Sequence, residues 1–298
     1  MLLSPADVLK YGLEIMGIKA RKEKTKVFEF HKHFGSSPLD IAQMWSNLCE
    51  LEGKLKPKEK SMRGFNRFLM AIFWLWTYPK NLSLMASRFK VCKDYCQGKH
   101  LWTWIQRVAD LKEQKIKWDD SLDDPAGEIF VVSADGVDFR KWEKKHDKFN
   151  IDQKACSHKW KHCAAKYLVV LSTFRAQCVM VAGPYLGGVS DLEMFIDCGL
   201  MDKLKANNKV AIVDRGFRSK KEDERKHHAY PDGMDSKELN NFKARARLRH
   251  ETFNRRLRHY SALEITFRHG FKKHKIVMDA VATIVQYQMD NGSPIYSV

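Results

Sequence analysis

Apolar residues in the first third of the chain recur at the three- and four-residue spacing of amphipathic helices. One helix is expected to begin after Ser37, a capping residue, because Pro38 suits the first helical position and Asp40 suits the first turn. The same spacing predicts three more helices, over residues 65–77, 82–89 and 101–111. The N-terminal part of the chain is therefore expected to be all-helical.

Two of these helices are joined by a tight turn at "FKVCKD", residues 89–94. This arrangement outlines a helix-turn-helix, whose second helix could enter the major groove of DNA. An ordinary helical bundle with its aromatic residues in the core explains the pattern equally well. Gly98 weakens the DNA-binding interpretation, because glycine costs about 1 kcal/mol relative to alanine inside a helix.

The hydrophobic pattern changes after the acidic stretch "KIKWDDSLDDPAGE", residues 115–128. Strands are predicted over 128–135, 167–174, 177–183 and 209–214, with a helix over 190–204. The short link between the second and third strands requires an antiparallel hairpin, and the helix before the fourth suits a crossover. A long basic helix follows over 239–260. The pattern predicts an α/β fold with a mixed sheet flanked by helices.

The charge balance points to a polyanionic partner. The 298 residues include 53 Lys and Arg against 36 Asp and Glu, a formal net charge of +17. Such an excess favours nucleic acid over a membrane surface. Solvated basic faces without a partner are the alternative interpretation.

No membrane span or secretion signal is expected. The longest apolar run, "FLMAIFWLW" at 68–76, is about half the length that a bilayer requires, and the N-terminus lacks the pattern of a signal peptide. The seven cysteines fit a reducing compartment, so we expect an intracellular protein. A structural zinc site at Cys156, His158, His162 and Cys163 is disfavoured by their spacing.

Two predicted strands end on an aspartate that has a glycine close behind it. Asp135 precedes Gly136, and Asp214 lies two residues before Gly216. In an open α/β sheet the carboxyl ends of strands border the functional crevice, so both carboxylates could converge there. Glu251 lies in the long basic helix. The plainer alternatives are surface turns for the aspartates and an ion pair within the helix for Glu251.

Several stretches together resemble the PIF/Harbinger group of DDE transposases. These are "SADGVDF" around Asp135, "GPYLGGVSDLEMF" at 183–195, "VDRGFR" around Asp214 and "ARARLRHETFNRRLRHY" around Glu251. The stretch "FEFHKHFGSSPLDIAQMW", residues 28–45, is similar to the helical entry segment of such proteins. The resemblance covers most of the chain, and its combination of motifs is more specific than any one of them.

The resemblance implies an RNase H-like core in which Asp135, Asp214 and Glu251 are the catalytic and metal-binding residues. It implies cutting of transposon ends and joining of the 3′-hydroxyl to target DNA, with two Mg²⁺ ions for which Mn²⁺ can substitute. Carboxylates suit this role because Mg²⁺ prefers hard oxygen ligands. The family usually has tyrosine where this chain has Phe217, a departure that leaves the acids intact.

Two further aspartates lie in the same motifs. Asp138 is expected to point away from Asp135, because it is an odd number of residues along the strand. Asp191 is the rival for the second acid, and we interpret it as a structural cap of the helix that it opens.

Basic residues near the motifs are candidates for DNA phosphate contacts. They are Lys159, Arg215, Arg218, Arg247 and Arg255. Contacts of this kind make DNA affinity fall steeply with salt.

The sequence predicts four segments. They are a basic helical entry segment over 1–60, a helical segment over 61–115 that is the candidate helix-turn-helix domain, an RNase H-like catalytic domain over 127–275, and a C-terminal helix and tail over 276–298.

DNA, both as transposon ends and as target, is the expected partner. The resemblance further implies a Myb-like DNA-binding partner protein, a homodimer or larger assembly when active, and nuclear entry if the source is eukaryotic. Two alternatives stay open: a host-adopted, non-catalytic DNA-binding protein on the same fold, and an RNase H-like nuclease acting on another nucleic acid.

Overall fold

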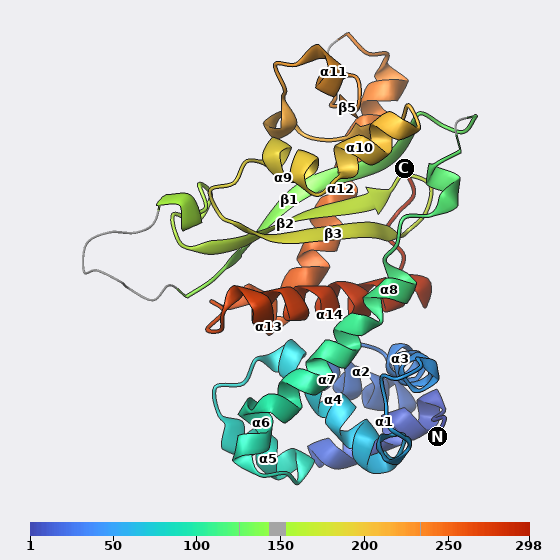
Figure 1. The fold of residues 1–298 in the computed structure, drawn as a ribbon. Helices are drawn as coiled ribbons and strands as arrows, with labels where there is room; N and C mark the ends of the chain where they lie inside the picture. The colour runs from blue at the N-terminus through green and yellow to red at the C-terminus, as the bar shows by residue number, and fades with distance from the viewer. Residues whose placement is uncertain (125, 143–152, 233) are drawn as a thin grey trace. The chain divides into compact units, whose positions relative to one another are not determined.

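The chain forms two compact units in the computed structural model, which describes residues 1–298 except 125, 143–152 and 233 (Figure 1). The helical unit comprises Met1–Lys115, Leu257–Ile265 and Ile276–Ser293. The sheet unit comprises Ile116–Arg256, Thr266–Lys275 and Pro294–Val298. The chain therefore returns to the helical unit twice after first leaving it.

Helices packed around aromatic side chains make up the helical unit. Trp45, Phe65, Phe68 and Trp104 are buried, and the Trp45 ring contacts each of the other three. Burying such large rings contributes much of the packing energy of a small unit. The elements are α1 (Pro5–Met16), α2 (Glu23–Phe34), α3 (Pro38–Glu50), η1 (Pro57–Glu59), α4 (Met62–Thr77), α5 (Leu82–Phe89), α6 (Lys93–Gln97), α7 (Lys99–Asp110), α8 (Lys112–Lys115), α13 (Ser261–Glu264) and most of α14 (Phe271–Asp290).

The start of α3 confirms the capping prediction. Ser37 Oγ accepts a hydrogen bond of 3.2 Å from the Asp40 amide, and the Asp40 carboxylate accepts one of 2.9 Å from the Ser37 amide. This reciprocal capping box satisfies amides that the helix itself leaves free. The helices predicted over 65–77 and 82–89 are confirmed as α4 and α5. Gly98 does not lie inside a helix; it separates α6 from α7.

A five-stranded mixed sheet lies at the centre of the sheet unit, in the order β3-β2-β1-β4-β5. β2 is antiparallel to both β1 and β3, whereas β4 is parallel to β1 and to β5. The strands are β1 (Phe130–Arg140), β2 (Ala164–Ser172), β3 (Cys178–Leu186), β4 (Val210–Ile212) and β5 (His228–Ala229). The predicted hairpin, the crossover and the α/β class are confirmed.

Side chains of β1 alternate between the two faces of the sheet. Val132 and Ala134 belong to the apolar core formed with α9 (Asp191–Asp197) and α10 (Leu200–Ala206). Ser133 and Asp135 face α12 (Lys237–Arg258), to which both are hydrogen-bonded. The unit also contains η2 (Asp120–Leu122), η3 (Gln153–Ala155), η4 (Arg215–Phe217) and α11 (Glu222–Arg225).

Several of the predicted elements are wrong in their extent, and the strand predicted over 209–214 is only Val210–Ile212. The strand predicted to end at residue 135 continues to Arg140, because the residues from Gly136 onward keep pairing with β2. The single helix predicted over 190–204 is broken into α9 and α10 at Gly199, whose φ of 77° lies in the left-handed region that glycine favours.

Candidate active site

Asp135 and Asp214 lie level with each other beside neighbouring parallel strands. Ser133 of β1 pairs with Ile212 of β4, and each aspartate is two residues further along its chain. β4 ends at Ile212, so Asp214 lies just beyond it, whereas Asp135 lies inside the longer β1. Both half-buried carboxylates therefore reach the same end of this strand pair.

A short turn orients the carboxylate of Asp214. Its Oδ1 accepts a hydrogen bond of 2.7 Å from the amide of Gly216, so Asp214 caps η4. Phe217, at the end of η4, is completely buried and packs edge-on against Phe195. The buried ring anchors the turn and thereby fixes the aspartate that precedes it.

The environment of Asp135 disfavours its ionised form. Burial is the largest cause, followed by the negative charges of Asp214 and Asp191, and together they raise the pKa of Asp135 to about 6. Hydrogen bonds from the Gly136 amide and from Asn254 oppose this rise. The raised pKa indicates that these three carboxylates share one electrostatic environment.

Two side chains of α12 hold this helix against β1. His250 Nε2 lies 2.9 Å from Ser133 Oγ, and the Asn254 side-chain amide donates a hydrogen bond of 3.1 Å to Asp135 Oδ2. Burial lowers the pKa of His250 to about 3, so this imidazole is neutral. The two contacts, one helical turn apart, set the position of α12 along the strand.

Glu251 lies on α12, next to His250 and one turn before Asn254, with an exposed side chain. Within the described part of the chain it makes no ion pair with Arg247 or Arg255. The plainer interpretation of Glu251 as an intrahelical ion-pair partner therefore finds no support. Asn254, rather than Glu251, makes the direct contact with Asp135.

The two rival aspartates have different surroundings. Asp138 accepts a hydrogen bond from Ser157. The unbroken register of β1 with β2 from residue 135 to residue 138 confirms that Asp138 lies on the other face of the strand from Asp135. The interpretation of Asp191 as a cap is wrong, because Ser190 Oγ accepts the capping hydrogen bond from the Glu193 amide. The Asp191 carboxylate instead lies 3.0 Å from Lys166 Nζ.

Sequence reasoning missed Asn254 and Lys166. Asn254 could have been found by helical spacing, because it lies one turn after Glu251. Lys166 carried no such signal, since its role depends on the position of β2 relative to the start of α9.

Comparison with known protein families decides the class of the protein. The family model described as DDE superfamily endonuclease matches residues 135–286, half of the chain, from Asp135 through Asp214 and Glu251. The chain belongs to the DDE superfamily endonucleases. Searches among curated proteins and among solved structures gave no match. Membership in this family implies nuclease or transposase activity on DNA.

DDE endonucleases generally use divalent metal ions, and the donors at this site fit such an ion in kind. Carboxylate oxygens are the ligands that hard divalent cations prefer, and neighbouring carboxylates that repel one another are stabilised by a cation. Among the residues that the structure describes, no three His, Cys, Asp or Glu side chains already surround one metal position.

The five predicted DNA-contacting residues of the DDE endonuclease are all exposed, and within the described ranges none of them forms an ion pair. Arg215 directly follows Asp214, and Arg218 stacks on the ring of Tyr230 with 5.4 Å to its centroid. Lys159 lies near the Trp160 ring, while Arg247 and Arg255 flank Glu251 on α12.

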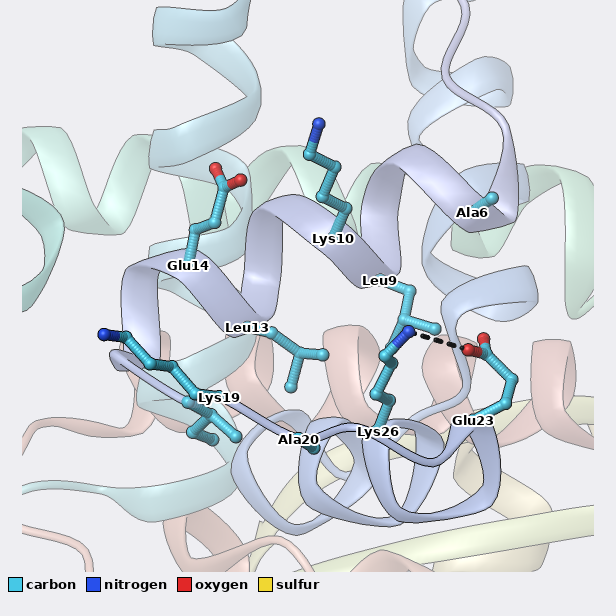
Figure 2. A pocket seen from close by; sticks show the side chains of 10 residues that line it. Ala6, Leu9, Lys10, Leu13, Glu14, Lys19, Ala20, Glu23 and Lys26 are labelled. Atoms are coloured by element: carbon cyan, nitrogen blue, oxygen red, sulfur yellow. Dashed lines mark hydrogen bonds and ion pairs between the residues drawn. The ribbon is translucent and has the colours of Figure 1, made fainter.

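A groove of about 400 Å³ lies in the helical unit, and none of these carboxylates lines it (Figure 2). Leu9 and Leu13 are among its apolar lining, and Lys26 pairs with Glu23 across 3.1 Å at its rim. Two carboxylates line the groove, Glu14 from α1 and Glu23 from α2, and they belong to no cluster of three acids among the described residues.

None of the described helices is long and apolar enough to cross a membrane.

Proposed function

We propose that this DDE endonuclease is a DNA transposase of the PIF/Harbinger type, which cuts transposon ends and joins the freed 3′-hydroxyl to target DNA. The observation that carries the proposal is the level position of Asp135 and Asp214 beside neighbouring parallel strands. The hydrogen bonds that hold α12, and with it Glu251, against β1 support the same proposal.

We further propose that the sheet unit has an RNase H-like fold. The strand order β3-β2-β1-β4-β5, with β2 antiparallel, supports this, as does the order of hairpin, crossover and acid-bearing helix. On this proposal 127–275 is the catalytic domain, 1–60 the entry segment, 61–115 a helix-turn-helix domain and 276–298 the C-terminal helix and tail.

Asp135, Asp214 and Glu251 would hold the metal. Two magnesium ions held there, or manganese in their place, would supply activation of the attacking water or hydroxyl and stabilisation of the leaving oxygen. The side chains of Arg215 and Arg218 orient the phosphodiester beside Asp214, while Lys159, Arg247 and Arg255 bind flanking phosphates. Asn254 holds the carboxylate of Asp135 in place through its hydrogen bond.

The partners of the proposed transposase follow from its group. We propose a Myb-like DNA-binding partner protein, action as a homodimer or larger assembly, and a nuclear location if the source is eukaryotic. Cleavage of paired transposon ends supports the need for at least two copies.

A host-adopted DNA-binding protein without catalysis is the second candidate. The five exposed cationic side chains, none of them in an ion pair in the described ranges, favour DNA binding whether or not the acids are active. This candidate predicts salt-dependent binding of duplex DNA and no cleavage with any divalent ion.

Cleavage of a plasmid that carries the DNA flanking the gene tests the proposal. The full chain is expected to nick this plasmid only with Mg²⁺ or Mn²⁺, and Asp135→Asn, Asp214→Asn and Glu251→Gln are expected to be inactive. Asp197→Asn is the matched control, because the Asp197 carboxylate is exposed on α9 and accepts a hydrogen bond from Tyr185. An Asp214→Asn variant that cuts at the wild-type rate would exclude the proposed function.

A further inference from the structure

The carboxylate of Asp191 lies in a space that two glycines leave open. A Cβ added to Gly136 would be 2.1 Å from Asp191 Oδ1, and one added to Gly216 would be 3.0 Å from Asp191 Oδ2. Real Cβ atoms essentially never approach other atoms as closely as the first of these distances. Any larger residue at position 136 would therefore displace this carboxylate.

These glycines are not required by backbone conformation. Neither Gly136 nor Gly216 has a positive φ, so other residues could adopt the same backbone angles. Gly136 lies within β1, where a glycine without special angles commonly marks the close approach of another group. The approaching group at Gly136 is the side chain of Asp191, and at Gly216 it is the side chains of Asp191 and Asp214.

The two glycines also locate Asp191 relative to the proposed metal ligands. Gly136 directly follows Asp135, and Gly216 closes the turn capped by Asp214, with its added Cβ 2.9 Å from Asp214 Oδ1. Asp191 thus approaches the backbone beside each of the two aspartates, at Gly136 from the face of β1 opposite to the Asp135 side chain. A carboxylate that served only to start α9 would not need this position, because Ser190 already caps that helix.

Lys166 holds Asp191 in this position. Its ammonium group lies 3.0 Å from Asp191 Oδ1 and donates a hydrogen bond of 2.8 Å to the carbonyl of Val189. Only 12% of the Lys166 side chain and 26% of the Asp191 side chain are exposed. The Lys166 ammonium offsets the charge of the Asp191 carboxylate while no metal is bound.

We propose that Asp191 is a further carboxylate of the metal centre, which Lys166 holds near Asp135 and Asp214 to raise the affinity for the divalent ion. The inference rests on the proposed function, because it assumes a metal centre at these two aspartates. It adds Asp191, at the start of α9, to the three acids of the proposed triad.

Manganese binding to the full chain, followed by the electron paramagnetic resonance signal of free Mn²⁺, tests the inference without any measurement of activity. Asp191→Asn is expected to weaken Mn²⁺ affinity by about 10- to 100-fold, the usual effect of losing a supporting group at a metal site. Asp197→Asn is the matched control, because Asp197 lies on the same short helix, is exposed and bonds only to Tyr185 in the described structure.

Two further variants protect the test against misfolding. Asp191→Asn leaves the Lys166 ammonium without its carboxylate, so a double variant with Lys166→Gln removes both charges and is expected to show the same loss. Gly136→Ala keeps the carboxylate but displaces it, and should also weaken Mn²⁺ binding. In an Asp191→Ala background, Gly136→Ala should cause no further loss, because the added methyl group then finds room.

The outcomes separate the inference from the function on which it rests. If Asp135→Asn and Asp214→Asn lose Mn²⁺ while Asp191→Asn and the charge-free double variant bind it like the wild type, the inference is overturned and the proposed metal centre stands. If Mn²⁺ binding is the same in the wild type and in Asp135→Asn, the metal centre is wrong and the inference falls with it.

Discussion

Asn254 on α12 donates a hydrogen bond of 3.1 Å to Oδ2 of Asp135 on β1, two residues that are 119 positions apart in the chain. This bond joins the first candidate acid to the helix that carries the third. Because Asn254 lies one turn after Glu251 on α12, this contact also fixes the position of Glu251 relative to β1.

Removal of this bond should make metal binding more sensitive to acid. The hydrogen bond from Asn254 lowers the pKa of Asp135, so Asn254→Leu raises that pKa further above about 6 and protons compete better with the metal. We expect Mn²⁺ affinity to fall about tenfold at pH 6.5 and clearly less at pH 8.5, where Asp135 is ionised in both proteins. Titrations at the two pH values measure this difference.

Asn241→Leu provides the comparison for that titration. Asn241 is exposed on the same helix, so its replacement should leave the pH dependence unchanged. A loss in Asn254→Leu that is equal at both pH values would show that Asn254 acts by some route other than the protonation of Asp135.

The raised pKa of Asp135 predicts that its ionisation opposes folding. The folded carboxyl ionises near pH 6, whereas an unfolded one ionises near about 3.9. The free energy of unfolding therefore decreases as pH rises through this window, which is the opposite of the pH dependence that an aspartate usually contributes. Asp135→Asn removes the penalty and should be more stable than the wild type in metal-free buffer, by about 3 kcal/mol at pH 7.5 and about 1 kcal/mol at pH 4.5.

Urea unfolding of both proteins at the two pH values checks this expectation. Saturating Mg²⁺ should reduce the advantage of Asp135→Asn, because only the wild type gains stability from the bound ion. Equal stability of the two metal-free proteins at pH 7.5 would mean that Asp135 is not held in a charge-disfavouring environment.

Arg249 and Arg247 should behave oppositely although they are two residues apart. The Arg249 side chain is only 1% exposed, and its guanidinium donates to the carbonyls of Ser172, Thr173 and Arg175 at the β2–β3 turn. Arg249→Met leaves these carbonyls without donors and should destabilise the protein by about 3 kcal/mol or more. Arg247→Met, at an exposed position, should change stability by less than about 0.5 kcal/mol.

Thermal or urea unfolding distinguishes the two arginine variants, and DNA binding gives the complementary result. Arg247→Met should weaken DNA binding while it leaves folding intact. Normal stability of Arg249→Met would show that the turn carbonyls find other donors.

Arg215 and Arg218 should contribute to affinity through phosphate charge. Each lost phosphate contact lowers the slope of log affinity against log salt by about 0.9, so Arg215→Ala/Arg218→Ala should reduce it by about 2. Fluorescence anisotropy of labelled duplex DNA between 50 and 200 mM salt measures the slope. Arg175→Ala, which removes a cation already paired with Asp119, should leave the slope unchanged; a similar reduction there would indicate a general charge effect.

Local signals in the sequence predicted the elements well and their limits less well. Ser37 and Asp40 correctly predicted the start of α3, because the capping hydrogen bonds form between residues that are close in the sequence. Gly136 suggested the end of a strand, yet β1 continues because its pairing with β2 outweighs the low strand propensity of glycine. The break at Gly199 likewise depends on a left-handed backbone angle that the helical spacing did not reveal.

The aspartates of the candidate site were recognisable, but their supporting residues were not. Asp135 and Asp214 stand in short motifs that follow apolar runs, so their nearness could be inferred from parallel strands. Lys166 and Asp191 form their ion pair only because α9 is placed close to β2. Gly136 leaves room for the same Asp191 carboxylate, so its role also depends on that placement. Relationships of this kind arise from three elements at once, and no single stretch of sequence contains them.

The two bonds between α12 and β1 also have a consequence for the chain that joins them. A shift of α12 by one residue would rotate it by about 100° and break both the His250–Ser133 and the Asn254–Asp135 contacts. The position of Glu251 relative to Asp135 is thus set by the contacts of α12 with β1 and not by the length of the connection from Ala229 to Lys237. Insertions or deletions in that connection can accumulate during evolution without moving Glu251 relative to Asp135.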